Sequence, residues 1–371
     1  MTALESPVKN NLVVEETETA VSTTRRYDID WIRTLALALL IIYHTTISFQ
    51  PWAGYIGFPK NEDSLEVLWI GMALINVWRI PILFLISGMG VRFAMERRDW
   101  KALLKDRTIR ILVPLVFGVF FIVPTFIFFI LKYYDQEPQY APALGHLWFL
   151  ANIYIYVILL MPLFYYLKNH PDNFLVRGMT ALLRWPVMLL LVALPLMLEA
   201  WLVAPEVYET YAETAHGFWL GLICFFLGFL FITLKDVFWT AVKGVRWLAL
   251  GIAFLLYLVR FFVFQFEGSP NVLTALESIC WMLAIVGFGA LYLNKPSKYL
   301  SYFSGAVYPV YIIHMTILFA LLYVIIPLDL PALVKLAMLL VGTFGISLLL
   351  YEFVLRRIKW IRPLFGMKFK K

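Results

Sequence analysis

The chain has 371 residues, of which 62% are hydrophobic and only 15% are charged, and its mean hydropathy is +0.81. A water-soluble domain of this composition would expose too much apolar surface, so these values exclude a soluble globular protein and indicate an integral membrane protein. The formal net charge of +7 is no sign of a nucleic-acid partner, because Lys and Arg in membrane proteins gather in cytoplasmic loops. We therefore expect the lipid bilayer, and no nucleic acid, as a partner.

The first 24 residues are polar and contain no apolar core, so they do not form a secretory signal peptide. We expect residues 1–24 to be a disordered cytoplasmic tail. The two cysteines, Cys224 and Cys280, both lie within apolar runs. Their number and spacing favour small apolar fillers over a disulfide or metal framework.

Apolar segments of about 20 residues, separated by polar breaks, follow this tail. We place ten spans near residues 31–50, 66–91, 111–131, 147–167, 186–204, 216–234, 246–265, 273–293, 305–326 and 332–354. The sequence therefore predicts an all-α polytopic membrane protein with about ten transmembrane helices. The predicted transmembrane domain covers residues 25–355, and residues 356–371 form a basic cytoplasmic tail.

The basic residues predict how the spans are oriented. They gather at the start of the chain and after every even-numbered span, as in the loop RFAMERRDWKALLKDRTIR after the second span. The opposite loops carry acidic residues, among them Glu62, Asp63, Glu206, Glu209 and Glu213. By the positive-inside rule both termini are cytoplasmic, which an even number of spans also requires.

The first span contains ionisable residues that are costly at bilayer depth. Its sequence, RRYDIDWIRTLALALLIIYHTTISF, carries Asp30, Arg33 and His44. The eleven steps from Arg33 to His44 turn a helix by about 20° modulo full turns and rise about 16 Å, so these residues share one stripe. Such a stripe favours a site reached from the cytoplasm, with His44 as general base or proton shuttle. The alternative is a neutral histidine that is hydrogen-bonded to a neighbouring helix.

Arg79 lies near the middle of the second span, one turn after Asn76. A lone arginine at this depth needs an anion or several carbonyl groups around it. It either binds an anionic ligand or forms a structural ion pair with Glu199 or Glu277. The sequence SGMG, from Ser87 to Gly90, allows close helix packing or close approach of a ligand.

Arg107 and Arg110 share one face at the start of the third span. Arginine side chains suit phosphate oxygens, and they also serve as ordinary positive-inside anchors. His146 and Trp148, in GHLWFL, are expected at the outer mouth of the fourth span, where an interfacial aromatic belt is the alternative.

The ninth span contains the sequence YPVYIIHMTI, with Tyr311 and His314. By its depth, His314 is able to approach His44. His170 and His216 are expected to be structural, and the sequence gives no partner for Arg260. None of the histidines has the close spacing of metal ligands, so we expect no metal.

Taken together, these residues resemble the signature of acyltransferase family 3, membrane-bound O-acyltransferases of bacterial surface glycans. The resemblance covers about residues 26–355. It rests on Asp30, Arg33 and His44, on Arg79 to Gly88, on Arg107, Arg110 and Pro114, on His146 to Leu150, and on Tyr311 with His314. The stretches YDIDWIR, RIPILFLISG and HLWFL are most similar to the branch that includes periplasmic-glucan succinyltransferases.

The resemblance implies that an acyl group of the acetyl or succinyl type moves from cytoplasmic acyl-CoA to a hydroxyl group. The acceptor would usually be a carbohydrate of the cell surface or periplasm, and the protein would lie in the cytoplasmic (inner) membrane. The family's arginine–histidine pair in the first span corresponds to Arg33 and His44. Its pair of arginines before the third span corresponds to Arg107 and Arg110.

These expectations give each candidate residue a role. Arg33, Arg107 and Arg110 would pair with the CoA phosphates, and Asp30 is counted with them as a cofactor-binding residue. His44 would deprotonate the acceptor or take the acyl group itself. His314 and Tyr311 would orient His44 or stabilise the oxyanion. Arg79, Ser87, His146 and Trp148 would contact the substrates, with Arg79 on a carboxylate of the acyl group.

A proton-coupled multi-span transporter or exporter of a polar solute is the alternative function, because buried Arg, Glu and His also serve proton relays. A catalytically inactive scaffold is less favoured, since all the motif residues are present. Dependence on acyl-CoA separates the enzyme from the transporter.

Overall fold

The computed structural model describes residues 25–367, and these form helices and connecting segments without a β-strand. The all-α prediction is therefore confirmed for this part of the chain, while the predicted tail 1–24 lies outside it. The α-helices are α1 (Tyr27–Ile47), α2 (Leu68–Met95), α3 (Trp100–Arg107), α4 (Val113–Phe117), α5 (Val123–Tyr133), α6 (Trp148–Asn169), α7 (Phe174–Leu182), α8 (Ala193–Val203), α9 (Ala215–Thr233), α10 (Asp236–Phe262), α11 (Asn271–Tyr292), α12 (Lys298–Ile325) and α13 (Ala332–Leu350).

Shorter turns extend or join these helices. The 3₁₀ turns are η1 (Ala53–Ile56), η4 (Gly145–Leu147), η5 (Pro186–Val192) and η7 (Arg362–Phe365), and the π-helical turns are η2 (Thr108–Leu112), η3 (Gly118–Ile122) and η6 (Tyr351–Leu355). Through η2 and η3, helices α3, α4 and α5 form one continuous segment, Trp100–Tyr133. π-helical turns often occur at functional sites, and η2 carries Arg110.

Within residues 25–367, nine helical segments are long and apolar enough to cross a membrane. They coincide with the last nine predicted spans. The predicted first span corresponds to α1, which is helical but is not one of the nine. The side chains of Asp28, Asp30, Arg33 and His44 make α1 more polar than these nine segments. The total of ten spans and the cytoplasmic position of both termini remain predictions.

Some predicted boundaries were wrong. Helix α10 begins at Asp236, ten residues before the predicted start of the seventh span, so Lys243 belongs to a helix rather than a loop. Long basic side chains keep their charge at the interface while their stems cover apolar surface, which lets a helix extend past the apolar core. The predicted basic loop after the second span contains α3, whose first turn is capped by the Asp99 carboxylate accepting from the Ala102 amide.

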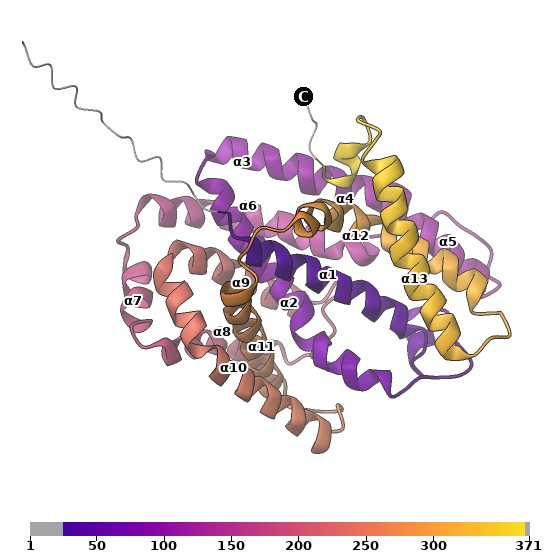
Figure 1. The fold of residues 1–371 in the computed structure, drawn as a ribbon, viewed down its shortest axis with the longest axis horizontal. Helices are drawn as coiled ribbons and strands as arrows, with labels where there is room; N and C mark the ends of the chain where they lie inside the picture. Colours follow the sequence, from indigo (N-terminus) through magenta and orange to yellow (C-terminus); the bar gives the residue numbers. More distant parts are fainter. Residues whose placement is uncertain (1–24, 368–371) are drawn as a thin grey trace, which may run out of the picture.

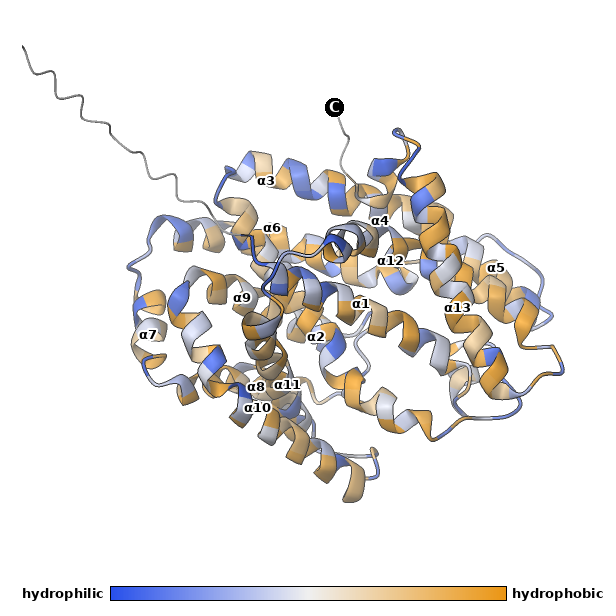
Figure 2. Cartoon of the chain, in the orientation of Figure 1, coloured by the Kyte–Doolittle hydropathy of each residue, from blue (hydrophilic) through white to orange (hydrophobic). Residues whose placement is uncertain are grey.

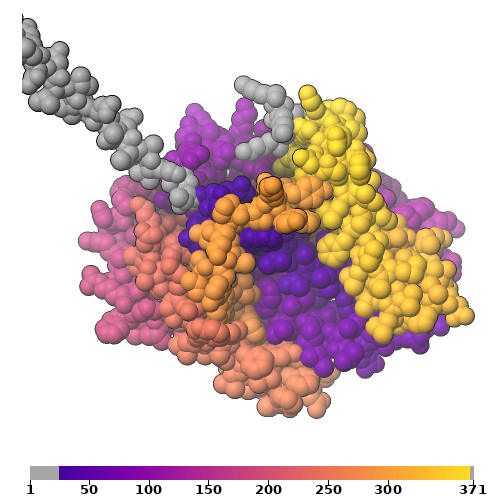
Figure 3. All heavy atoms as spheres, in the orientation of Figure 1, coloured from indigo at the N-terminus to yellow at the C-terminus, as the bar shows by residue number. Residues whose placement is uncertain are grey.

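Helix α1 lies centrally in the bundle and packs against α2, α11, α12 and α13 (Figure 1). Apolar residues run along the lengths of the helices, whereas hydrophilic residues gather in α3 and at helix ends (Figure 2). On the face in Figure 3, α1 lies in a hollow between the orange segment of α11 and α12 and the yellow α13.

Helices α2 and α9 are in close backbone contact at two glycines. A Cβ atom on Gly88 would lie 1.9 Å from the Phe225 carbonyl oxygen, and one on Gly228 would lie 1.9 Å from that of Leu85. This contact supports the helix-packing interpretation of Gly88 in the SGMG sequence. It also holds the cavity-facing side of α2 in a fixed position.

The segment after α13 folds back onto the bundle. Phe365 is buried and contacts the Phe117 ring at 5.5 Å between centroids. Gly366 has a φ of +68°, and a Cβ atom there would lie 2.0 Å from the Tyr308 ring and 3.0 Å from the Arg110 carbonyl oxygen. Part of the predicted basic tail, at Phe365 and Gly366, is therefore packed beside Arg110.

Candidate active site

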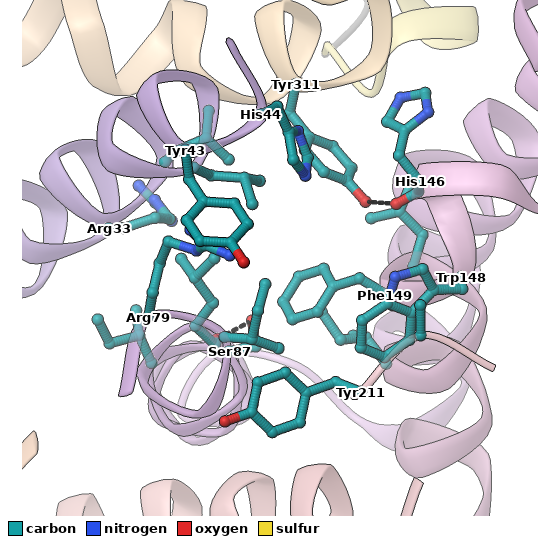
Figure 4. Close-up of a pocket in the computed structure, with 18 of the residues that line it drawn as sticks. Arg33, Tyr43, His44, Arg79, Ser87, His146, Trp148, Phe149, Tyr211 and Tyr311 are labelled. Atoms are coloured by element: carbon teal, nitrogen blue, oxygen red, sulfur yellow. Dashed lines mark hydrogen bonds between the residues drawn. The ribbon is translucent and has the colours of Figure 1, made fainter. Parts of the chain in front are cut away.

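A cavity of about 720 Å³ lies within the bundle and is lined by residues of α1, α2, η2, α6, α12 and the segment between α8 and α9 (Figure 4). Along α2 the lining runs from Trp69 to Val91, about 33 Å at the helical rise per residue. That length is about the thickness of the hydrocarbon core of a bilayer. One end of the cavity is lined by Arg33, Arg107 and Arg110, and we call it the arginine end. The other is lined by Trp52 and Trp69, and we call it the tryptophan end.

Two histidines from distant parts of the sequence meet in the bundle. His44 Nδ1 on α1 lies 3.1 Å from His314 Nε2 on α12, so the approach predicted from depth is confirmed. His314 Nδ1 lies 2.6 Å from the Tyr311 carbonyl oxygen, which accepts and never donates. His314 is fully buried, whereas His44 is half-buried and lines the cavity.

These contacts assign the tautomers of the neutral pair. His314 Nδ1 must carry the proton that it donates to the Tyr311 carbonyl, which leaves His314 Nε2 as an acceptor. His44 Nδ1 must then carry a proton and donate it to His314 Nε2. The remaining nitrogen, His44 Nε2, is then unprotonated, and the hydrogen bond that the described residues give the His44 ring runs through Nδ1. A nitrogen of this kind is suited to accept a proton from a ligand.

His146 and Tyr311 lie beside this pair. His146 Nε2 donates to the Ile312 carbonyl oxygen at 3.1 Å, and the Tyr311 hydroxyl donates to the His146 carbonyl oxygen (Figure 4). The His146 ring centroid is 5.2 Å from that of His314. His146, on η4 just before α6, therefore forms a cluster with His44 and His314. The Tyr311 hydroxyl proton is already donated to the His146 carbonyl oxygen.

Trp148 and Ser87 also line the cavity. Trp148 is only 8% exposed because it packs against Phe84 and Phe149, so little of its ring is free for stacking. This differs from the exposed position expected at an outer mouth. The Ser87 hydroxyl donates to the Leu83 carbonyl oxygen at 2.7 Å, and its oxygen is still able to accept.

Arg79 has no carboxylate partner in the described structure, so the alternative of an ion pair with Glu199 or Glu277 does not hold. Glu199 accepts from His216 Nδ1 at 2.9 Å, which fits the structural role expected for His216, and Glu277 accepts from Arg260 Nε at 2.9 Å. Arg79 Nη2 donates to the Asn76 side chain at 3.2 Å, and the guanidinium lies 3.8 Å above the Tyr43 ring. Its Nε and Nη1 are buried and have no protein acceptor among residues 25–367.

Two arginines of the arginine end, Arg33 and Arg107, have different environments. Arg33 pairs with Asp30 at 2.6 Å, and Asp30 also pairs with Arg25 at 2.7 Å. Arg107 makes a single weak hydrogen bond, 3.3 Å to the Gly90 carbonyl, and its buried Nε has no acceptor in the described part. Asp30 does not line the cavity, and its carboxylate is bonded to Arg33, which does.

Several cavity residues were not predicted as site residues. Tyr43 supports Arg79, and Tyr308 lines the wall near Arg110. Glu209 and Tyr211, between α8 and α9, line the part of the cavity toward the tryptophan end. No local sequence pattern marks them, because their positions depend on contacts between segments far apart in the chain.

The comparisons with known proteins place the chain in a family. A family model described as an acyltransferase domain matches residues 26–352. The chain belongs to the acyltransferase 3 family. It is therefore an enzyme, and the transporter alternative is set aside.

Curated relatives of this acyltransferase carry the name glucans biosynthesis protein C. The protein of Escherichia coli K12 is 24% identical over 332 residues, which are 79% of this chain and 82% of the relative. The protein of Shigella dysenteriae serotype 1 is 25% identical over the same shares of both chains. No solved structure matches this acyltransferase significantly.

Proposed function

We propose that this membrane acyltransferase moves an acyl group from cytoplasmic acyl-CoA to a hydroxyl group of a glycan, with His44 as the base. One observation carries the proposal: a single cavity joins three arginines to the His44–His314 pair and continues to an opposite end. Such a passage fits a reaction whose two substrates arrive from opposite sides of a membrane. The name of the curated relatives supports a glucan as the acceptor.

The arginine end faces the cytoplasm in this proposal and binds the phosphates of the donor. Arg33, Arg107 and Arg110 line it together, and arginine forks match phosphate oxygens. The buried Arg107 Nε lacks an acceptor among residues 25–367, as expected of a group that binds an anionic ligand. Asp30 contributes by holding Arg33 in place.

The unprotonated Nε2 of His44 acts as the base in the proposed acyl transfer. His44 Nε2 takes the proton of the acceptor hydroxyl, and the oxygen attacks the thioester carbonyl carbon. The new carbon–oxygen bond forms as the carbon–sulfur bond breaks, and the departing CoA sulfur takes the proton back from His44. If the acyl group passes through His44, the same nitrogen is the nucleophile, and burst kinetics identify that route.

His314 and Tyr311 act on His44 rather than on the substrates. The hydrogen bonds from His44 to His314 and from His314 to the Tyr311 carbonyl hold the imidazole ring in one orientation. The Tyr311 hydroxyl is donated to the His146 carbonyl, so we assign Tyr311 to positioning and not to the oxyanion. Ser87 and His146 also line the cavity, and we assign them as contacts for the substrates.

Arg79 is proposed to bind a carboxylate at the far end of the acyl group. It is 3% exposed, and two of its N–H-bearing nitrogens are without an acceptor in the described structure. An uncompensated cation at this depth is costly, and a carboxylate would offset the cost. A dicarboxylic acyl group of the succinyl type supplies one.

The experiment uses the purified full chain in lipid nanodiscs. Acetyl-CoA and succinyl-CoA are titrated, and the release of free thiol is followed with and without a glucose oligomer. We expect saturable binding, thiol release, and weaker binding of analogues that lack the 3′-phosphate. If neither thioester binds or turns over, the proposed function is wrong.

A further inference from the structure

The tryptophan end of the cavity contains a rigid aromatic corner. Trp52 follows α1, Trp69 lies in the first turn of α2, and their rings meet edge to face with centroids 5.5 Å apart and an interplanar angle of 77°. Both side chains line the cavity and are partly buried. Tryptophan offers a large apolar face together with a polar N–H, which suits a ligand that has both apolar and polar surfaces.

A carboxylate is fixed on the same side of the cavity. Arg260 Nη1 donates to Glu209 Oε1 at 2.7 Å, while Arg260 Nε donates to Glu277 at 2.9 Å and Nη2 donates to the Ala73 carbonyl at 2.7 Å. Arg260 is thus held by α2 and α11 and holds Glu209 in turn. The second oxygen of Glu209 has no partner among residues 25–367, and Glu209 lines the cavity.

The segment that carries Glu209 is anchored on more than one side. The Tyr211 hydroxyl donates to the Val77 carbonyl at 3.1 Å, and burial keeps the pKa of this phenol well above its usual value. The Asn271 side chain donates to the Pro205 carbonyl at 2.7 Å. A Cβ atom on Gly217 would lie 1.8 Å from the Tyr211 carbonyl oxygen, so the segment packs directly on α9. This wall is preformed, as is usual for ligand sites.

The two ends of the cavity differ in charge. Three arginines line one end, whereas a carboxylate lies toward the other. The polyanionic donor is attracted to the arginine end and repelled by Glu209. A neutral ligand with many hydroxyl groups meets no such repulsion, and its hydroxyls are able to donate to the free oxygen of Glu209.

We propose that the tryptophan end is the acceptor subsite, where a sugar ring lies against Trp52 and Trp69 and donates hydroxyl groups to Glu209. This assignment rests on the proposed acyl transfer to a glycan. It replaces stacking on Trp148, whose ring is buried against Phe84. A sugar held there lies in the same cavity as His44.

The test measures transfer from succinyl-CoA or acetyl-CoA to a panel of glucose heptasaccharides of different linkage, using the full chain in nanodiscs. The variants are Trp52→Leu, Trp69→Leu and Glu209→Gln. Trp201→Leu is the matched control, because Trp201 is 66% exposed and does not line the cavity. Thiol release without acceptor reports whether each variant still folds and binds the donor.

We expect the KM for the oligosaccharide to rise about tenfold in each Trp variant, equivalent to about 1.4 kcal/mol. The KM for acyl-CoA and the thiol release without acceptor stay unchanged, and the control behaves as wild type. An unchanged oligosaccharide KM in all three variants would overturn the subsite, as would a wild type that hydrolyses acyl-CoA but acylates none of the sugars. A wild type without any thioester turnover would instead overturn the proposed function and the subsite together.

Discussion

His44 and His314 form a hydrogen bond of 3.1 Å between His44 Nδ1 and His314 Nε2, and this bond determines which nitrogen of His44 is free. Because His314 Nδ1 is committed to the Tyr311 carbonyl, the proton between the two rings belongs to His44. His44 Nε2 is left as the acceptor. In other acyl-transfer sites, too, the base is oriented by a hydrogen bond to a further group.

Replacing His314 should lower kcat without changing donor binding. In His314→Ala, His44 loses its acceptor and its fixed tautomer, so we expect a loss smaller than the roughly 10²- to 10⁴-fold effect of removing a general base itself. In His314→Gln, the amide oxygen is able to accept from His44 Nδ1 and should restore part of kcat. Steady-state kinetics on acyl-CoA compare the two variants. Equal losses in both would mean that His314 acts through packing alone.

Arg107→Ala should mainly raise the KM for acyl-CoA. A hydrogen bond to a charged group contributes about 1.5–3 kcal/mol, which corresponds to a KM increase of roughly 10- to 100-fold. The control is Arg184→Ala, an exposed arginine that does not line the cavity. An unchanged KM with a lowered kcat would argue against a phosphate contact for Arg107.

Arg79→Gln should change the choice of donor. Without the cation, we expect kcat/KM for succinyl-CoA to fall roughly 10- to 100-fold while that for acetyl-CoA changes little. Arg79→Lys keeps the charge but loses the planar fork, so its succinyl activity should be intermediate. Competition between the two thioesters measures the ratio. A ratio that stays at the wild-type value in both variants would remove Arg79 from donor recognition.

Gly366→Ala should loosen the C-terminal segment at the arginine end. The positive φ and the 2.0 Å approach of a Cβ atom to the Tyr308 ring are both incompatible with alanine, so the destabilisation should exceed about 1 kcal/mol. We expect a lower thermal unfolding midpoint in detergent and a higher KM for acyl-CoA. Gly178→Ala is the control, because a Cβ atom there has no heavy atom within 4 Å. Identical unfolding midpoints for the two variants would contradict the tight packing of Gly366.

The sequence predicted the helical segments well because apolar length is a local property. It also predicted the meeting of His44 with His314, since depth in a span follows from position along the chain. It did not predict the partners of Arg79, Glu199 and Arg260, because ion pairs between helices depend on which helices are neighbours.

Short helices and site loops were missed for a related reason. Helix α3 is short and polar, and α7 (Phe174–Leu182) is short, so neither stands out from a basic loop. In the sequence, Glu209 is one of several acidic residues in a loop. In the structure, the bond from Arg260 holds it at the cavity wall. Glu209 lies on a connecting segment, and its position at the cavity depends on contacts that the local sequence does not show.

The most direct measurement of the central claim is acyl-CoA turnover by His44→Ala in nanodiscs, beside wild type and His170→Ala. His170 is an exposed histidine outside the cavity lining and serves as the matched control. We predict that all three proteins bind acyl-CoA with similar affinity and that only His44→Ala loses thioester turnover, by roughly 10²- to 10⁴-fold. Near-wild-type turnover in His44→Ala would contradict the assignment of His44 as the base.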